Sequence, residues 1–210
     1  MISLPIEKKT SVKTIFFNLK KVVASMLLVL LASCGNTDNS LPTPKPKGYF
    51  RIALPAKSYQ TYTAACPFSF EYPTYAQVIH DPRPDAQPCW LNVIFPRFHG
   101  SIHLTYKHVD DNLNKYLEEC RTLAIKHEIK ASSINEQVII NDSSKVYGLV
   151  YDIEGNAASP MQFYLTDSVS NFIRGSLYFE AVPNSDSIQP VSDFIKEDIK
   201  KMIATFKWKN

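Results

Sequence analysis

The side chains best suited to acid–base or metal chemistry are the five histidines and several paired carboxylates of the chain. His99 and His103 are four residues apart in a region that reads as strand and turn, so about 13 Å separates them, which is too far for one zinc ion. Cys120 and His127 are seven residues apart on a predicted helix, about 10 Å, which is also too far. The sequence has no nucleophile-elbow serine, phosphate-binding glycine loop or paired-cysteine zinc spacing. We therefore predict no catalytic residue, no metal site and no cofactor.

Residues 151–163 combine polar and small side chains in an unusual arrangement. Asp152, Glu154 and Asn156 are spaced by two, as in a calcium loop, but the bidentate glutamate of such a loop is missing. A Gly155-Asn156 hairpin turn flanked by solvated acids explains the segment without any function. The alternative is a partner-contact loop, because small side chains leave the backbone accessible. Its candidate residues are Asp152, Glu154, Gly155, Asn156, Ser159 and Gln162.

Cys34 has the most specific chemistry in the chain, because of what precedes it. Lysines up to Lys21 are followed by an apolar run over residues 22–31 and then by Ala32 and Ser33. About ten apolar residues are too few to span a bilayer, which takes about 20, but they suit a signal peptide. The order of charge, apolar run, small residues and cysteine is that of the bacterial lipobox, where the thiol is acylated. We predict a signal peptide over residues 1–33 and a membrane anchor on Cys34.

The residues that follow predict a tether and a separate folded domain. Residues 34–48 are polar and then rich in proline, which indicates an extended segment ahead of a single domain over residues 49–210. The whole chain carries a net charge of +3, and its first 33 residues, with five lysines and one glutamate, carry +4. The remainder is therefore −1, which gives no electrostatic reason to expect a nucleic acid partner.

Three cysteines follow the predicted anchor. Cys66 and Cys89 each lie at the start of a predicted strand and beside a proline, whereas Cys120 falls on the apolar face of a predicted helix. An envelope compartment is oxidising, so a disulfide can form there. We predict a Cys66–Cys89 disulfide and a free, buried Cys120.

Hydrophobic periodicity predicts strands, a helix, four strands and a final helix. Asp110 or Asp111 is expected to cap the first helix, and Pro190 to lie in the first turn of the second. Short connections between successive strands imply antiparallel pairing, so we expect an α+β fold: one antiparallel sheet with helices packed on it. The strands are predicted at residues 68–72, 76–80, 90–95, 102–109, 136–141, 146–153, 160–166 and 170–181, and the helices from about residue 110 and over residues 188–206.

Six stretches of the mature chain resemble one known family. They are PKGYFRI (46–52), CPFSFEYP (66–73), PCWLN (88–92), RTLA (121–124), YDIEGNAASP (151–160) and FIKED (194–198). In this order they resemble the GldD family of gliding-motility lipoproteins of Bacteroidetes-type bacteria. The resemblance implies a cell-envelope lipoprotein needed for gliding, linked to type IX protein secretion and partnered by other envelope proteins of these systems. It implies no catalytic residue. The order of elements is also similar to PsbP-type domains, a likeness of topology alone.

The function we expect is that of a non-catalytic assembly component. Some surface-displayed lipoproteins of these bacteria carry an acidic run just after the acylated cysteine, whereas here only Asp38 is acidic shortly after Cys34. We therefore expect an anchor in the outer membrane with the domain facing the periplasm. The inner membrane is the alternative. A periplasmic small-ligand or glycan-binding lipoprotein is the second hypothesis, with Trp90, Tyr49 and Tyr151 as groove aromatics. A hydrolase is the third, and it would require a clustered polar pocket.

Overall fold

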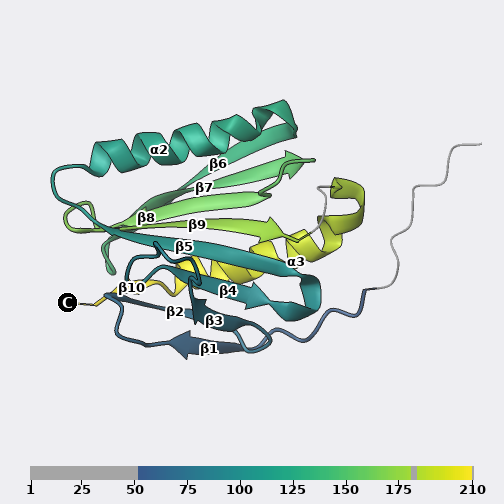
Figure 1. Cartoon of the computed structure of the whole chain (residues 1–210), viewed down its shortest axis with the longest axis horizontal. Helices are drawn as coiled ribbons and strands as arrows, with labels where there is room; N and C mark the ends of the chain where they lie inside the picture. The colour runs from purple at the N-terminus through teal and green to yellow at the C-terminus, as the bar shows by residue number, and fades with distance from the viewer. Residues whose placement is uncertain (1–51, 181–183, 210) are drawn as a thin grey trace, which may run out of the picture. The chain divides into compact units, whose positions relative to one another are not determined.

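The computed structural model describes residues 52–180 and 184–209, which fold into two antiparallel sheets and two α-helices. β1 and β10 flank β2 in the smaller sheet, and the larger sheet has the order β3-β4-β5-β9-β8-β7-β6 (Figure 1). The strands are β1 (Tyr59–Tyr62), β2 (Phe68–Pro73), β3 (Gln77–His80), β4 (Leu91–Phe95), β5 (Gly100–His108), β6 (Ala131–Asn141), β7 (Val146–Gly155), β8 (Met161–Thr166), β9 (Asn171–Phe179) and β10 (Lys207–Trp208). The helices are α2 (Leu113–Ile125) and α3 (Ser185–Ala204), with short 3₁₀ turns η1 (Pro96–Phe98) and η2 (Lys126–Ile129).

The two helices cover opposite faces of the larger sheet. Because side chains alternate along each strand, successive residues of one strand contact α3 and α2 in turn. On β7, Val150 packs in the main core with Ile195 and Ile199 of α3. Its neighbour Tyr151 points the other way and packs with Ala124 of α2. The main core also takes in the aromatic side chains of β2, where Phe68 and Phe70 are fully buried. The α+β fold class predicted from the sequence is confirmed.

A buried carboxylate joins the start of the described domain to α3. Asp198 is wholly buried, and its oxygens accept hydrogen bonds from Lys57 Nζ (2.6 Å), Tyr59 Oη (3.0 Å) and Tyr75 Oη (2.6 Å). The Lys57 ammonium also lies 3.4 Å from the centre of the Phe194 ring and donates to the Phe194 carbonyl. Burial of an ionised carboxylate is tolerated only when it is paired and hydrogen-bonded, and this cluster meets that requirement.

Several predicted boundaries were wrong, for local reasons. α3 begins at Ser185, three residues before the predicted start, so Pro190 lies inside the helix rather than in its first turn. Neither Asp110 nor Asp111 caps α2; Asn112 precedes the helix, and Asp111 has a φ of 51°, which belongs to the preceding turn. The single predicted sheet is two sheets, because β1 and the two-residue β10, which were not predicted, pair with β2 to form a sheet of their own.

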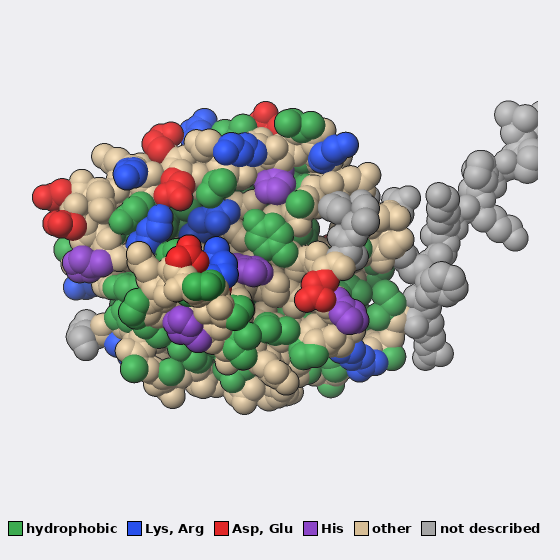
Figure 2. Space-filling model, in the orientation of Figure 1, with side chains coloured by type: hydrophobic (Ala, Val, Ile, Leu, Met, Phe, Trp, Pro, Cys, Tyr) green, Lys and Arg blue, Asp and Glu red, His purple; other side chains and the backbone are tan. Residues whose placement is uncertain are grey.

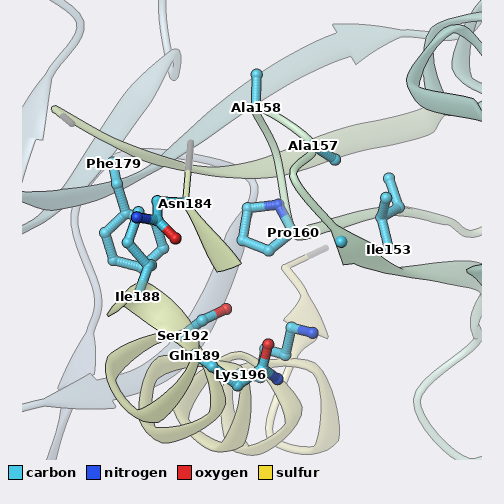
Figure 3. Close-up of a pocket in the computed structure, with 11 residues that line it drawn as sticks. Ile153, Ala157, Ala158, Pro160, Phe179, Asn184, Ile188, Gln189, Ser192 and Lys196 are labelled. Atoms are coloured by element: carbon cyan, nitrogen blue, oxygen red, sulfur yellow. The ribbon is translucent and has the colours of Figure 1, made fainter. Parts of the chain in front are cut away.

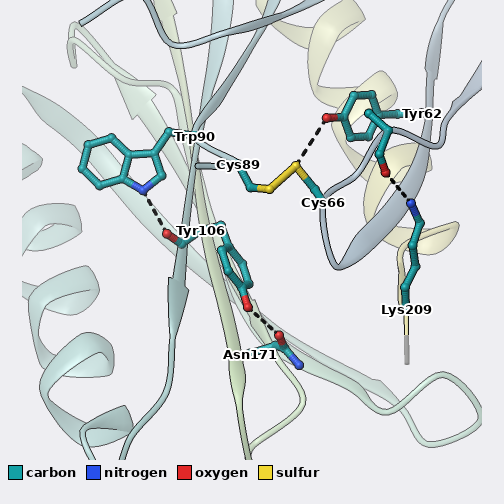
Figure 4. The surroundings of a disulfide bond; sticks show 8 residues. Tyr62, Cys66, Cys89, Trp90, Tyr106, Asn171 and Lys209 are labelled. Atoms are coloured by element: carbon teal, nitrogen blue, oxygen red, sulfur yellow. Dashed lines mark hydrogen bonds between the residues drawn. A yellow bond between two sulfur atoms is a disulfide. The ribbon is translucent and has the colours of Figure 1, made fainter. Parts of the chain in front are cut away.

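Cys66 and Cys89 form the disulfide that the sequence suggested, with their Cα atoms 5.6 Å apart. It links the start of β2 to the start of β4, and Tyr62 Oη lies 3.5 Å from the Cys66 sulfur (Figure 4). Beside it, the Trp90 indole N–H donates to the Tyr106 carbonyl. Cys120 is free and buried between α2 and the sheet, and burial raises the pKa of its thiol to about 11. The disulfide therefore fixes the smaller sheet to the larger one.

Candidate functional site

A small pocket lies between the segment that follows β7 and the first half of α3. Figure 3 shows Ala157, Ala158 and Pro160 on one side of it and Gln189, Ser192 and Lys196 of α3 on the other. Its walls are mainly apolar on the loop side and polar on the helix side. The complete lining is Ile153, Gly155, Ala157, Ala158, Pro160, Phe179, Asn184, Ile188, Gln189, Ser192 and Lys196.

The size of the pocket limits what can occupy it. Its cavity volume is about 30 Å³. A single water needs roughly 10–15 Å³ of such space, so the pocket holds about two waters. Sites for small-molecule ligands are typically about 300–1,000 Å³. The pocket in this form therefore suits one small side chain of another protein better than a sugar or a nucleotide.

The helix side of the pocket supplies its polar groups. Ser192 is 3% exposed, and its hydroxyl has no hydrogen-bond partner among the described residues. One turn further along α3, the Lys196 ammonium is buried and donates to Asp152 Oδ1 of β7. This ion pair ties α3 to β7 at the floor of the pocket, while the Ser192 hydroxyl remains available to an incoming group.

The loop side is held by backbone contacts. Gly155 ends β7 with a φ of +93°, a conformation that side-chain-bearing residues rarely adopt. The Asn156 N–H donates to the Lys130 carbonyl, and the Ile153 N–H donates to the Pro160 carbonyl. These bonds fix both ends of the loop, so the pocket wall is a defined structure.

Gly155→Ala is expected to destabilise the domain by about 2 kcal/mol, because a Cβ would be strained at this φ and would lie 2.7 Å from the Ser132 nitrogen. Chemical denaturation of the purified protein measures the change. A free energy of unfolding equal to that of the wild type would show that the turn relaxes without cost and that the loop is not fixed by Gly155.

The structure brings together some of the predicted contact residues and separates others. Gly155 lines the pocket, whereas Asp152 reaches it only through its ion pair with Lys196. Glu154 is exposed and accepts a hydrogen bond from Ser133. The prediction that Ser159 and Gln162 contact a partner was wrong, because neither side chain is at the surface. Ser159 is wholly buried and donates to the Met161 carbonyl, and Gln162 is 2% exposed on the α2 face of the sheet, where it accepts from Arg174.

The contribution of α3 was missed by the sequence analysis. Ser192 and Lys196 are one helical turn apart, and Ser192 lies four residues after Ile188 and three before Ile195. This spacing places a polar residue on the apolar stripe of the helix, which is the signal that could have revealed it. Their meeting with the loop after β7 depends on tertiary packing, which local periodicity does not encode.

Of the aromatic residues predicted to line a groove, the two that are described, Tyr151 and Trp90, line none of the pockets. Tyr151 is 3% exposed and packs against α2, and Trp90 is half-buried with the Arg83 guanidinium 5.3 Å from its ring. Tyr49 and Cys34, together with the predicted signal peptide and tether, lie outside the described residues. Figure 2 shows acidic and basic side chains interspersed over the face in view.

These features define an α+β domain with a small surface pocket between the loop after β7 and α3. The chain belongs to the family described as gliding motility lipoprotein GldD, whose sequence model matches residues 39–208. The family is one of lipoproteins, which indicates a cell-envelope location, and it is not a family of known enzymes. Across the described residues, no helix has the length and apolarity needed to cross a bilayer.

Comparison with solved structures gives a distant likeness. The chain is similar to the solution structure of cyanobacterial PsbP (CyanoP) from Synechocystis sp. PCC 6803, with 12% identity and a TM-score of 0.46. The match covers 76% of this chain and 97% of the other. A likeness of this degree carries no argument about function. No curated protein matches the chain.

Proposed function

We propose that this protein is a lipid-anchored envelope component that helps to assemble the gliding and type IX secretion machinery by binding other proteins, without catalysing a reaction. The anchor is acyl chains on Cys34, and the folded domain faces the periplasm from the outer membrane. Membership of the gliding-motility lipoprotein family supports the general role. The lipobox order of residues around Cys34 supports the anchor.

The observation that carries the binding role is the small pocket beside the loop after β7. Its volume suits one side chain, its loop wall is made of alanine and proline, and its helix wall presents a buried hydroxyl without a partner. Protein interfaces often depend on a single anchor side chain that fills such a recess. Ala158 is exposed at the rim, so a partner can approach from the loop side.

Covering the mouth of the pocket should impair gliding while the protein still folds. Ala158→Trp places a large side chain at an exposed position on the rim, so we expect wild-type abundance in the membrane fraction but reduced colony spreading. In cells treated with a crosslinker, the variant should lose envelope partners that the wild-type protein captures. Ile129→Trp is the matched control, because Ile129 is 87% exposed on η2 and does not line the pocket. Equal spreading and equal capture by Ala158→Trp and the control would reject the pocket as the contact site.

The anchor has a separate test. Mass spectrometry of the mature protein should find an N-terminal Cys34 carrying acyl chains, because the preceding residues form a lipobox. Two or three chains would give stable attachment at about 0.8 kcal/mol per buried CH₂. Recovery of the mature protein from the soluble fraction, or of an unmodified Cys34, would contradict the proposal. Cys34→Ser should abolish acylation.

A further inference from the structure

A second and larger hollow lies at one end of the domain, away from the loop after β7. The turns that follow β6 and β8 form one side of it and β10 forms the other. We call this the β10 groove. Its cavity volume is about 800 Å³, within the range of small-molecule sites. It is lined by Ser143, Ser144, Lys145, Asp167, Val169, Ser170, Asn171, Lys207, Trp208 and Lys209.

The charge of the groove is positive. Lys145, Lys207 and Lys209 face a single acid, Asp167. Lys209 donates to the Ala64 carbonyl at 2.7 Å, whereas the ammonium groups of Lys145 and Lys207 have no acceptor among the described residues. Both lysines are exposed, and they come from parts of the chain that are far apart in the sequence: Lys145 from the turn after β6 and Lys207 from β10.

Asp167 does not neutralise these lysines. Its Oδ1 accepts the backbone N–H groups of Val169, Ser170 and Asn171, each at 2.9 Å, and its Oδ2 accepts the Asn171 side-chain amide at 2.6 Å. The carboxylate is therefore used to shape the turn between β8 and β9. No ion pair joins it to Lys145, Lys207 or Lys209 in the described part of the chain.

The remaining lining suits a hydroxylated molecule. The hydroxyls of Ser144 and Ser170 make no hydrogen bond within the described residues, so they can both donate and accept. The Trp208 side chain is held in place by packing, since its ring lies edge-on to the Phe206 ring with 4.8 Å between the ring centroids. Its indole N–H is buried without an acceptor among the described residues, and a buried tryptophan N–H usually has one.

We propose that the β10 groove binds a sugar that carries a phosphate, either as a free molecule or as the headgroup of a lipid. Three lysines against one aspartate leave two positive charges, which match a phosphate monoester of about −1.5 to −2 at pH 7. Lysine ammonium groups bind phosphate as point charges. The serine hydroxyls and the tryptophan wall then face the sugar ring. The proposal is independent of the pocket beside α3.

Calorimetric titration of the full mature lipoprotein in detergent micelles tests this assignment. The soluble probes are glucose 6-phosphate, inorganic phosphate and glucose. The lipid probe is lipid A, whose headgroup is a phosphorylated sugar, titrated as mixed micelles of the same detergent, with detergent micelles that lack lipid A as the blank. We expect glucose 6-phosphate or the lipid A micelles to give a binding heat, and glucose and the blank micelles to give none. Binding of the soluble probe identifies a free sugar phosphate, and binding of the lipid A micelles alone identifies a lipid headgroup.

Matched variants locate the binding. Lys145→Gln with Lys207→Gln should weaken binding at least tenfold. Lys126→Gln with Lys130→Gln removes the same charge from exposed positions outside the groove and should leave affinity unchanged. Wild-type melting temperatures for both double variants establish that the fold is intact. The proposal is overturned if no phosphorylated probe binds, if inorganic phosphate binds as tightly as the sugar phosphate, or if both double variants lose affinity equally.

Discussion

Asp198→Ala should lower the free energy of unfolding by about 3 kcal/mol and the melting temperature by roughly 6–12 °C. The substitution removes the common acceptor of Lys57, Tyr59 and Tyr75. The two hydroxyls and the Lys57 ammonium all lose that buried acceptor, although the Lys57 side chain is 29% exposed and can turn toward water. The cost of breaking a buried pair comes mainly from the partners left behind. Thermal and chemical denaturation measure it.

A neighbouring acid on the same helix serves as the control. Asp193 is exposed and, within the described part of the chain, accepts a side-chain hydrogen bond from Gln189 alone, so Asp193→Ala should change stability by no more than about 0.5 kcal/mol. A second readout is the ionisation of Tyr59, since burial and Asp198 together raise the pKa of Tyr59 to about 12. Asp198→Ala should lower that pKa part of the way toward its ordinary value. Equal stability of the two alanine variants would contradict the importance of the cluster.

Loss of the Cys66–Cys89 disulfide should cost about 3 kcal/mol. The bond closes a loop with a sequence separation of 23, and closing a loop of this length restricts the unfolded chain by about that amount. The double variant Cys66→Ser with Cys89→Ser should therefore melt well below the wild type. The reduced wild-type protein should behave like the double variant, because the same constraint is absent.

Cys120→Ala is the matched control for the disulfide. It removes a free sulfur and leaves the bond intact, so reduction should still destabilise this variant as it does the wild type. Non-reducing peptide mapping should recover Cys66 and Cys89 in one crosslinked species. A bond that includes Cys120, or a double variant as stable as the wild type, would refute the role assigned to the disulfide.

The sequence predicted best the strands that are rich in apolar residues and bounded by turn residues. β2 and β8 have strongly apolar residues bounded by turns, and both were found near their observed limits. β1 and β10 were missed because Tyr59–Tyr62 is half-exposed and Lys207–Trp208 is only two residues long. Their pairing with β2 depends on contacts distant in the sequence, which periodicity does not reveal.

The candidate site was predicted only in part, for a similar reason. The small residues around Gly155 marked the loop, but the opposite wall comes from α3, more than 30 residues further along the chain. The burial of Asp198 could have been predicted from the sequence. This residue lies three residues after Ile195 and four before Met202, on the stripe of the helix that faces the core. An acid on such a stripe must find buried partners, although the sequence alone does not identify Lys57, Tyr59 and Tyr75 as those partners.

The position of Lys57 has a mechanical consequence. In a protein held by a lipid at Cys34, any force between the bilayer and the folded domain passes along the chain and reaches Lys57 before it reaches β1. There it meets the bonds to Asp198 and Phe194, which fasten this end of the domain to a 20-residue helix. The load is thereby shared with the main core, so a moving cell envelope can pull on this lipoprotein without first peeling β1 from its sheet.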